Sequence, residues 1–265
     1  MTKTTLDIPS VSLFGIPVHA VTMTQALDII DGTIARRERM QIGVINAAKV
    51  VNMRRNPALG EDVMSSDLIL ADGIAVVWAS RLLRRPLPER VTGIDLMMGM
   101  LKRGNEQRYR VYCLGASEEV SSRVAERIAV DYPNVVLAGR HHGYFSEAES
   151  AGIAEDIAKA RPDILLVAIT SPRKEQFLAR WSEHIGAPIC HGVGGSFDVL
   201  AGKVQRASES WQRLGLEWLY RLKQEPGRMW RRYLVTNTLF CWMLFREVIR
   251  NMWRGLSRSP SPDSK

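Results

Sequence analysis

The sequence predicts an α/β protein with a Rossmann-like parallel-sheet core and a helical, basic C-terminal appendage. Short apolar runs that alternate with amphipathic helical patterns indicate the core. A concentration of positive charge and tryptophan after residue 202 indicates the appendage. We therefore divide the 265-residue chain into a core (1–202), a membrane-associating appendage (203–256) and a Ser/Pro-rich, disordered tail (257–265).

Six apolar runs are typical of strands buried on both faces of a parallel sheet. They are Gln41–Ile45, Leu68–Leu70, Tyr109–Leu114, Val135–Ala138, Ile164–Ile169 and Pro188–Val193. Helical patterns between them cover residues 24–37, 117–131 and 146–160. The last two begin with Ser and carry Glu in the first turn, where a carboxylate favours the helix dipole. The alternation predicts parallel strands joined by helices.

The charge of the chain is divided unevenly. Residues 1–202 carry 23 basic and 23 acidic residues, whereas residues 203–265 carry 13 and 5, so the net charge of +8 lies entirely after residue 202. Five of the seven tryptophans lie there too. Trp favours the lipid headgroup region, and each Lys or Arg near anionic lipid contributes about 1 kcal/mol. This pattern favours an anionic membrane surface as a partner, over a solvated surface helix and over nucleic acid.

From Ser208 onward the sequence predicts two or three helices. Trp211, Leu214, Trp218 and Leu222 recur at steps of three or four and predict one apolar stripe. A second segment, from Arg228 to about Trp253, has basic residues at both ends and resembles helices that lie in the membrane interface. The longest apolar run, Leu239–Phe245, is far shorter than the roughly 20 residues that span a bilayer. We therefore expect peripheral attachment.

The compartment is predicted from two further features. The N-terminus lacks the basic start and long apolar run of a signal peptide. The three cysteines suit neither a disulfide framework nor a metal site, which fits a reducing compartment. We expect a cytoplasmic location.

Candidate ligand contacts follow the predicted strands, because open α/β sheets bind ligands beyond the carboxyl ends of their strands. Asp72 follows one strand and precedes a glycine, and the turn at Gly115 could direct backbone N–H groups at a phosphate. Asp198, near Gly194 and Gly195, could accept ligand hydroxyls. Each has an equally simple structural interpretation as a tight turn or a helix cap. The Walker, GxSxG and complete GxGxxG patterns are absent, which disfavours NTPases, esterases and classical dehydrogenases.

Taken in order, these segments resemble the WecG/TagA/CpsF family of bacterial glycosyltransferases from about Ile16 to Leu234. The matching pieces are INAAKVV, ADGIAVVWASRLLRRPLPERVTGIDL, VYCLGAS, GYFS, SPRKE, GVGGSFDVLAGKVQRA and RLGLEWLYRLKQEPGRMWRRYL. The resemblance implies inverting transfer of a sugar from a UDP-sugar to an undecaprenyl-diphosphate-linked saccharide, at the cytoplasmic face of the bacterial inner membrane. Glucose, N-acetylmannosamine and N-acetylmannosaminuronate remain open as the donor sugar, and so does homo-oligomerisation.

The resemblance also assigns roles to residues. Asp72 matches the general base, which suits a carboxylate within hydrogen-bond reach of the acceptor hydroxyl, and Asn46 matches the polar residue that faces it. No metal and no cofactor is implied, because arginines can stabilise the leaving diphosphate. The further residues implied to contact substrate are Arg90, Thr92, Asp95, Gly115, Lys174, Gly194, Gly195, Asp198, Arg221, Arg228 and Arg231.

One position departs from the family pattern. Where the family often has PKQE, this chain has Pro172-Arg173-Lys174-Glu175, so Lys174 replaces a glutamine expected to touch substrate. A cation there would favour an anionic donor or an additional phosphate contact. Two other functions stay open: a membrane-tethered, non-catalytic UDP-sugar-binding scaffold, and a nucleic-acid binder that uses the basic appendage, whose affinity should fall steeply with salt.

Overall fold

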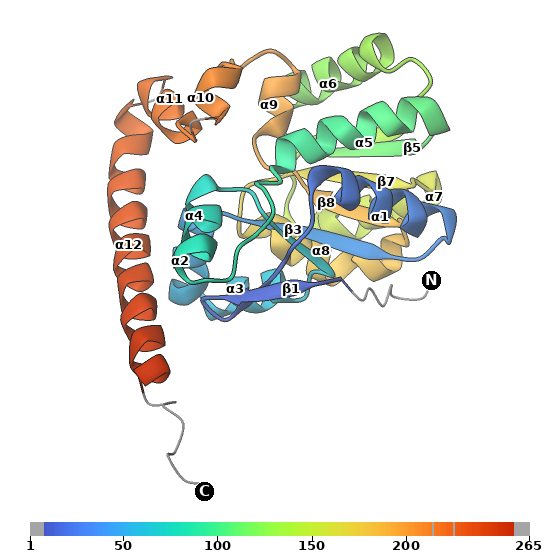
Figure 1. Cartoon of the computed structure of the whole chain (residues 1–265). Helices are drawn as coiled ribbons and strands as arrows, with labels where there is room; N and C mark the ends of the chain where they lie inside the picture. Colours follow the sequence, from blue (N-terminus) through green and yellow to red (C-terminus); the bar gives the residue numbers. More distant parts are fainter. Residues whose placement is uncertain (1–7, 214, 225, 257–265) are drawn as a thin grey trace, which may run out of the picture.

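A six-stranded parallel sheet forms the centre of the computed structural model, which describes residues 8–213, 215–224 and 226–256 (Figure 1). The strand order is β4-β3-β8-β7-β5-β6. The strands are β3 (Met40–Ile45), β4 (Leu68–Ala71), β5 (Arg110–Gly115), β6 (Val136–His141), β7 (Ile164–Ala168) and β8 (Ile189–Gly192). All six predicted strands are confirmed, with ends that shift by at most three residues.

Helices cover both faces of the sheet, which explains why the strands appear in the sequence as continuous apolar runs. One face packs against α1 (Met23–Ala35), α5 (Gly93–Gln107) and α6 (Glu118–Asp131). The other packs against α2 (Ala47–Arg55), α3 (Pro57–Met64), α4 (Ile74–Leu82), α7 (Ser150–Ala160) and α8 (Arg173–Ile185). The short helices η1 (Glu147–Glu149) and α9 (Ser196–Leu200) complete the core. The three predicted helices correspond to α1, α6 and η1 with α7.

An antiparallel hairpin, β1 (Ser10–Leu13) and β2 (Ile16–His19), precedes the sheet. Phe14 and Gly15 form its turn with positive φ angles of 55° and 82°. Phe14 is buried, and its ring centroid lies 5.3 Å from that of Phe240 near the other end of the chain. The hairpin thus helps to hold the last long helix.

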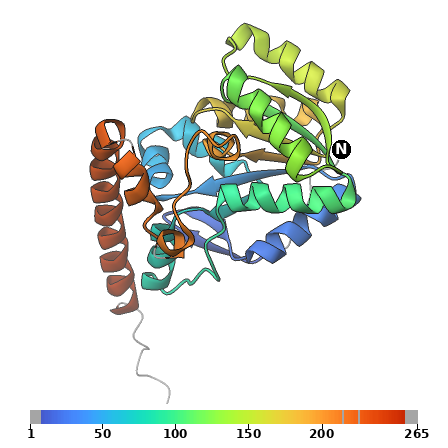
Figure 2. The ribbon, with the colours of Figure 1, turned by 90° about the horizontal axis from the view of Figure 1, so that it is seen from above.

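Three helices form the C-terminal part: α10 (Glu209–Arg213), α11 (Glu217–Gln224) and α12 (Pro226–Leu256). The 31-residue α12 lies along α2 at one edge of the molecule, as two perpendicular views agree (Figures 1 and 2). In the described part of the chain, no helix is both long enough and apolar enough to cross a bilayer. The predicted tail at 257–265 lies outside the described residues.

The prediction of one continuous apolar stripe from Trp211 to Leu222 is wrong. Gly215 has a φ of +71°, which separates α10 from α11 and turns the chain between them. Trp211 therefore meets Tyr220 edge-on at 5.9 Å, and Trp218 meets Tyr233 of α12 at 5.8 Å. Leu214, the remaining member of the predicted stripe, lies outside the described residues.

Candidate active site

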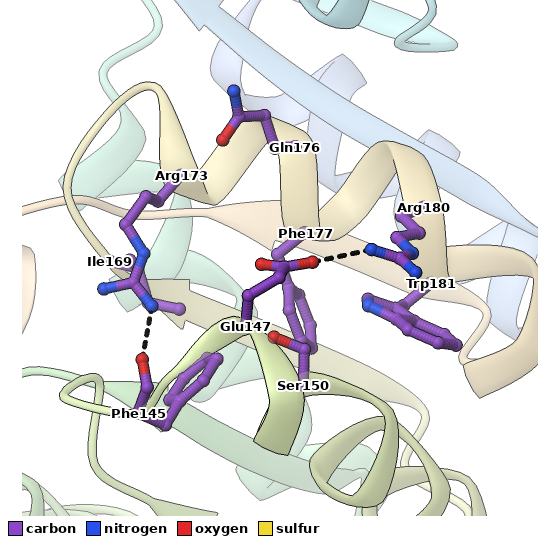
Figure 3. A pocket seen from close by; sticks show the side chains of 9 residues that line it. All are labelled: Phe145, Glu147, Ser150, Ile169, Arg173, Gln176, Phe177, Arg180 and Trp181. Carbon is purple, nitrogen blue, oxygen red and sulfur yellow. Dashed lines mark hydrogen bonds and ion pairs between the residues drawn. The ribbon is translucent and has the colours of Figure 1, made fainter.

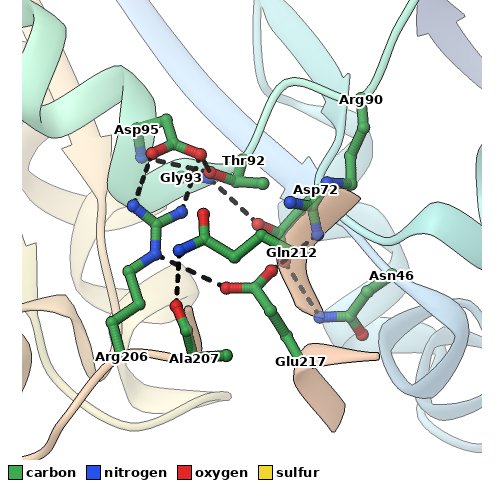
Figure 4. Close-up of polar contacts among 10 residues, drawn as sticks. All are labelled: Asn46, Asp72, Arg90, Thr92, Gly93, Asp95, Arg206, Ala207, Gln212 and Glu217. Atoms are coloured by element: carbon green, nitrogen blue, oxygen red, sulfur yellow. Dashed lines mark hydrogen bonds and ion pairs between the residues drawn. The ribbon is translucent and has the colours of Figure 1, made fainter. Parts of the chain in front are cut away.

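Asp72 and Asn46 lie side by side at the carboxyl edge of the sheet. Their strands, β4 and β3, pair in register through Ala71 and Ile45, so the two residues leave the sheet together. The side-chain amide of Asn46 donates to Oδ2 of Asp72 at 3.3 Å, and the backbone N–H of Gly93 donates to Oδ1 at 3.0 Å (Figure 4). Each carboxylate oxygen is thus held by one donor, which fixes the orientation of the side chain.

The local sequence positions Asn46. It is the N-cap of α2, and its Oδ1 accepts the backbone N–H of Lys49 at 3.0 Å. Asn is among the residues preferred at this position because its side chain satisfies a free N–H of the first turn. The amide oxygen serves the helix, so the amide nitrogen is left to face Asp72.

His191 supports Gly93 from within the sheet. The ring is fully buried on β8, and Nε2 lies 3.2 Å from the carbonyl oxygen of Gly93. Because a carbonyl oxygen only accepts, Nε2 carries the proton. Burial lowers the pKa of His191 to about 4, so the ring is neutral at pH 7. Gly93 is therefore held through both its carbonyl group and its N–H group.

Two lysines share one carboxylate beside Asn46. Glu175 Oε1 lies 2.5 Å from Nζ of Lys49 and 3.3 Å from Nζ of Lys174. Burial opposes ionisation of Glu175, but the two ammonium groups outweigh it and hold its pKa below the ordinary value. Burial and repulsion from Lys49 lower the pKa of Lys174 to about 8. At neutral pH this cluster, defined by Lys49, Lys174 and Glu175, carries one net positive charge.

The predicted contacts Arg90, Thr92 and Asp95 are brought to the same place as Asp72 (Figure 4). Thr92 caps α5, and its hydroxyl donates to Oδ2 of Asp95 at 2.5 Å. Arg90 pairs with Glu217 of α11 at 2.6 Å, and Asp95 accepts two hydrogen bonds from Arg206 at 2.6 and 2.8 Å. Arg90 and Asp95 are therefore held by side chains from the C-terminal part of the chain, whereas Thr92 is held within its own segment.

The remaining predicted residues are distributed more widely. Gly194 and Gly195 follow β8 and face open space, since a Cβ atom on either would meet no atom within 4 Å. Gly115, with a φ of +133°, lies against the backbone of Ala168, where a Cβ would approach the carbonyl group to 2.5 Å. The absence of a side chain at Gly115 lets β5 and β7 approach each other closely, at a place separated from Asp72 by other strands.

Among the described side chains of the remaining charged predictions, neither Asp198 nor Arg231 has a contact with Asp72. Asp198 is half-buried, with its carboxylate 3.9 Å from Nζ of Lys203. Arg231 is exposed on α12. Arg221 and Arg228 belong to α11 and α12, and their side chains lie outside the described residues.

A separate cavity of about 190 Å³ lies between η1, α7 and α8 (Figure 3). Arg173 donates to the carbonyl oxygen of Phe145 at 2.6 Å, and Arg180 pairs with Glu147 at 2.6 Å. Both guanidinium groups that line the cavity thus already have a protein partner. The cavity therefore differs from the cluster of Lys49, Lys174 and Glu175, in which two ammonium groups share one carboxylate.

Several residues of this site are not among the contacts predicted from the sequence. Arg206 pairs with Asp95, which lies 111 positions away in the sequence, and Glu217 pairs with Arg90, which lies 127 positions away. No local sequence pattern predicts contacts over such separations. His191 falls inside the predicted strand Pro188–Val193, where nothing in the apolar run distinguishes it. Glu217 did stand inside the quoted GLEWLYR block, which is the one signal that could have drawn attention to it.

Comparison with known proteins identifies the family of this chain. Residues 11–254 match the model of the "Glycosyl transferase WecG/TagA/CpsF family". The chain is 37% identical over 180 residues to an N-acetylglucosaminyldiphosphoundecaprenol N-acetyl-beta-D-mannosaminyltransferase of Bacillus spizizenii, covering 68% of this chain and 69% of that protein. It is 39% identical over 174 residues to the protein of the same name from Bacillus subtilis, covering 65% and 67%. The chain belongs to the WecG/TagA/CpsF family of glycosyltransferases.

Proposed function

We propose that this protein transfers a hexosyl group from a UDP-sugar to an undecaprenyl-diphosphate-linked saccharide, with Asp72 as general base. The observation that carries the proposal is the carboxylate of Asp72, oriented by Asn46 and Gly93 at the edge of the sheet where α/β proteins bind ligands. The names of the two relatives make N-acetylmannosamine the first donor to test and an N-acetylglucosaminyl-diphospholipid the first acceptor.

The reaction requires one bond to form and one to break. The acceptor hydroxyl oxygen attacks the anomeric carbon as its proton passes to Asp72, and the bond from that carbon to the β-phosphate oxygen breaks. UDP leaves with the bonding electrons, and attack opposite the leaving group inverts the anomeric centre. A positioned carboxylate contributes typically 10²–10⁴-fold in such a proton transfer.

The leaving diphosphate needs positive charge nearby, because negative charge builds on it as the bond breaks. The cluster of Lys49, Lys174 and Glu175 supplies one net positive charge next to Asn46. We assign further stabilisation to Arg221, Arg228 and Arg231 of the C-terminal helices. We propose that these cations act in place of a metal ion, and transfer that continues in excess EDTA would support metal independence.

Membrane contact belongs to the same proposal. One side of α12 exposes large apolar side chains at helical spacing, with Trp230, Trp242 and Trp253 exposed by 53%, 56% and 71%. Its other side packs into the core through Phe240. We assign the exposed side to the headgroup region of an anionic membrane at the cytoplasmic face of the inner membrane, where a lipid-linked acceptor is presented.

The test is UDP release by the purified full-length chain. UDP-N-acetylmannosamine, its uronic acid and UDP-glucose would each be offered with a synthetic N-acetylglucosaminyl-diphospholipid acceptor. Acceptor-dependent release with one donor, and a product one sugar larger by mass, would support the proposal. Binding of a UDP-sugar without release under all of these conditions would instead favour a non-catalytic scaffold and refute the transferase.

A further inference from the structure

A compact ion network joins the C-terminal part of the chain to the segment beside Asp72. Glu217, the first residue of α11, places its carboxylate 2.6 Å from Arg90 and 3.5 Å from Arg206. Arg206 in turn holds Asp95 through two hydrogen bonds. The network therefore contains two guanidinium groups and two carboxylates, and their formal charges cancel.

The network is partly shielded from water. The side chains of Arg90, Glu217 and Arg206 are exposed by only 17%, 18% and 23%. Burial would raise the pKa of Asp95, but hydrogen bonds from Arg206 and Thr92 outweigh it and hold that pKa below its ordinary value. Shielded Arg–carboxylate pairs with several hydrogen bonds are stronger and more specific in geometry than single surface pairs.

A second, independent contact seats the same part of the chain on the Asp72 turn. A Cβ atom on Gly215 would lie 2.6 Å from Cγ2 of Ile74, so only glycine permits this approach. Ile74 begins α4, two residues after Asp72. The turn between α10 and α11 thus rests directly on the segment that carries the proposed base. Figure 4 shows the flanking Glu217 paired with Arg206, while the Gln212 amide points at Ala207.

The segment from Arg90 to Asp95 connects the network to Asp72. Its outer residues bind Glu217 and Arg206, while its inner residue Gly93 donates to Oδ1 of Asp72. The backbone N–H of Val91 also bonds to the carbonyl oxygen of Ala71, immediately before Asp72. Movement of this short segment therefore displaces one of the two donors that orient the carboxylate.

We infer that Glu217 is a positioning residue, which neutralises Arg90 and Arg206 and thereby makes the orientation of Asp72 depend on the seating of α10 and α11. The inference rests on the proposed function for its catalytic consequence, but the structural coupling can be measured without it. Without the Glu217 carboxylate, two shielded guanidinium groups would share Asp95 alone. Their repulsion would loosen the segment from Arg90 to Asp95.

The first test is hydrogen exchange of the full-length chain with Glu217→Gln. We expect peptides covering residues 90–96 to exchange at least tenfold faster than in the wild type. Glu147→Gln is the matched control, because Glu147 also begins a short helix and pairs with an arginine at 2.6 Å, yet lies at the separate cavity. Unchanged exchange at 90–96 in Glu217→Gln would overturn the coupling, whether or not the protein proves to be a transferase.

The second test uses steady-state kinetics. Glu217→Gln should lower kcat by about tenfold to a hundredfold with less than a threefold change in the donor KM, because a misplaced base affects the chemical step. Glu217→Asp keeps the charge and should recover much of the loss. Equal losses in both variants, or a loss confined to KM, would overturn the inference.

A double-mutant cycle separates positioning from substrate binding. If Arg90 acts through Glu217, Arg90→Gln combined with Glu217→Gln should cost no more in kcat than the worse single variant. If Arg90 instead binds substrate independently, the two losses will multiply, and that outcome contradicts the inference. Exchange data from the first test identify any variant that fails to fold.

Discussion

A Cβ atom on Gly73 would lie 2.9 Å from Cβ of Asn46. The turn after Asp72 therefore packs directly against Asn46, whose side chain faces Asp72. Gly73 has a φ of −93°, an angle that any residue adopts, and the requirement for glycine is therefore one of space. Small size at position 73 is what permits the 3.3 Å contact between Asn46 and Asp72.

Gly73→Ala should consequently push Asn46 away from Asp72. We expect a loss of about tenfold or more in kcat/KM, since small displacements of positioned groups are costly in rate. Gly152→Ala on α7 is the control, because a Cβ there meets open space. If both variants retained full activity, the side-by-side arrangement would have no catalytic importance.

Asp72→Asn removes the proposed base but preserves the size of the side chain and an oxygen that can accept from Gly93. We expect kcat to fall by about 10²–10⁴-fold while the thermal unfolding midpoint changes little. Asp156→Asn serves for comparison, because that carboxylate is exposed on α7. Wild-type turnover by Asp72→Asn would show that another group accepts the proton.

His191 should make the free energy of unfolding depend on pH in the acidic range. Its folded-state pKa of about 4 lies below the ordinary 6.5, so between these values the unfolded chain binds a proton that the folded chain does not. The free energy of unfolding should therefore fall as pH drops from 6.5 toward 4, by up to about 3 kcal/mol from this group. Urea titrations at several pH values would measure it. His191→Gln retains an N–H donor without titrating, and a pH dependence parallel to the wild type would contradict the prediction.

Lys174 should favour an anionic donor. The net positive charge of its cluster predicts that Lys174→Gln lowers kcat/KM for a uronic-acid donor by about tenfold or more relative to the uncharged sugar, the range for a hydrogen bond to a charged group. Because the pKa of Lys174 is about 8, any such preference should disappear as pH rises through that value. Lys159→Gln, at an exposed position on α7, should leave the ratio of kcat/KM values for the two donors unchanged. A donor ratio that is unaffected in Lys174→Gln would exclude this role.

The exposed side of α12 should bind lipid. Trp242 and Phe245 stack at 5.9 Å and are exposed by 56% and 55%. Replacing both by Gln should weaken binding to phosphatidylglycerol-containing vesicles by about tenfold or more, since each aromatic side chain contributes roughly 1.5–3 kcal/mol when buried. Val130→Gln, at an exposed position of α6, is the control. Sedimentation with vesicles that is equal for all three proteins would remove the membrane assignment.

The sheet could be predicted from the sequence because strands such as β4 and β7 are apolar on both faces. Every residue of Leu68–Ala71 and of Ile164–Ala168 is buried, so the runs are continuous and unmistakable. The helix α8 is not among the predicted helices, and two of its buried positions are occupied by Lys174 and Glu175. Their charges are accommodated by pairing with each other and with the distant Lys49, which no local pattern reveals.

The site was predictable where it depends on strand ends and not where it depends on tertiary pairing. Asn46 and Asp72 each follow a recognisable strand, and parallel pairing brings them together. The partners Arg206 and Asp95 are separated by 111 residues, and their pairing follows from the path of the chain beyond the sheet. The break at Gly215 was hidden because tryptophans on both sides of it happen to keep a helical period.

The contact between Phe14 and Phe240 has a consequence for how the protein is made. Both rings belong to the same buried cluster, together with side chains of α2 and α4. That cluster stays open on one side until residue 240 has left the ribosome, although the strands nearer the N-terminus emerge much earlier. The half of the fold that carries Asn46 and Asp72 is therefore completed only after α12 has been made. An incomplete chain that ends before α12 would leave this core uncovered.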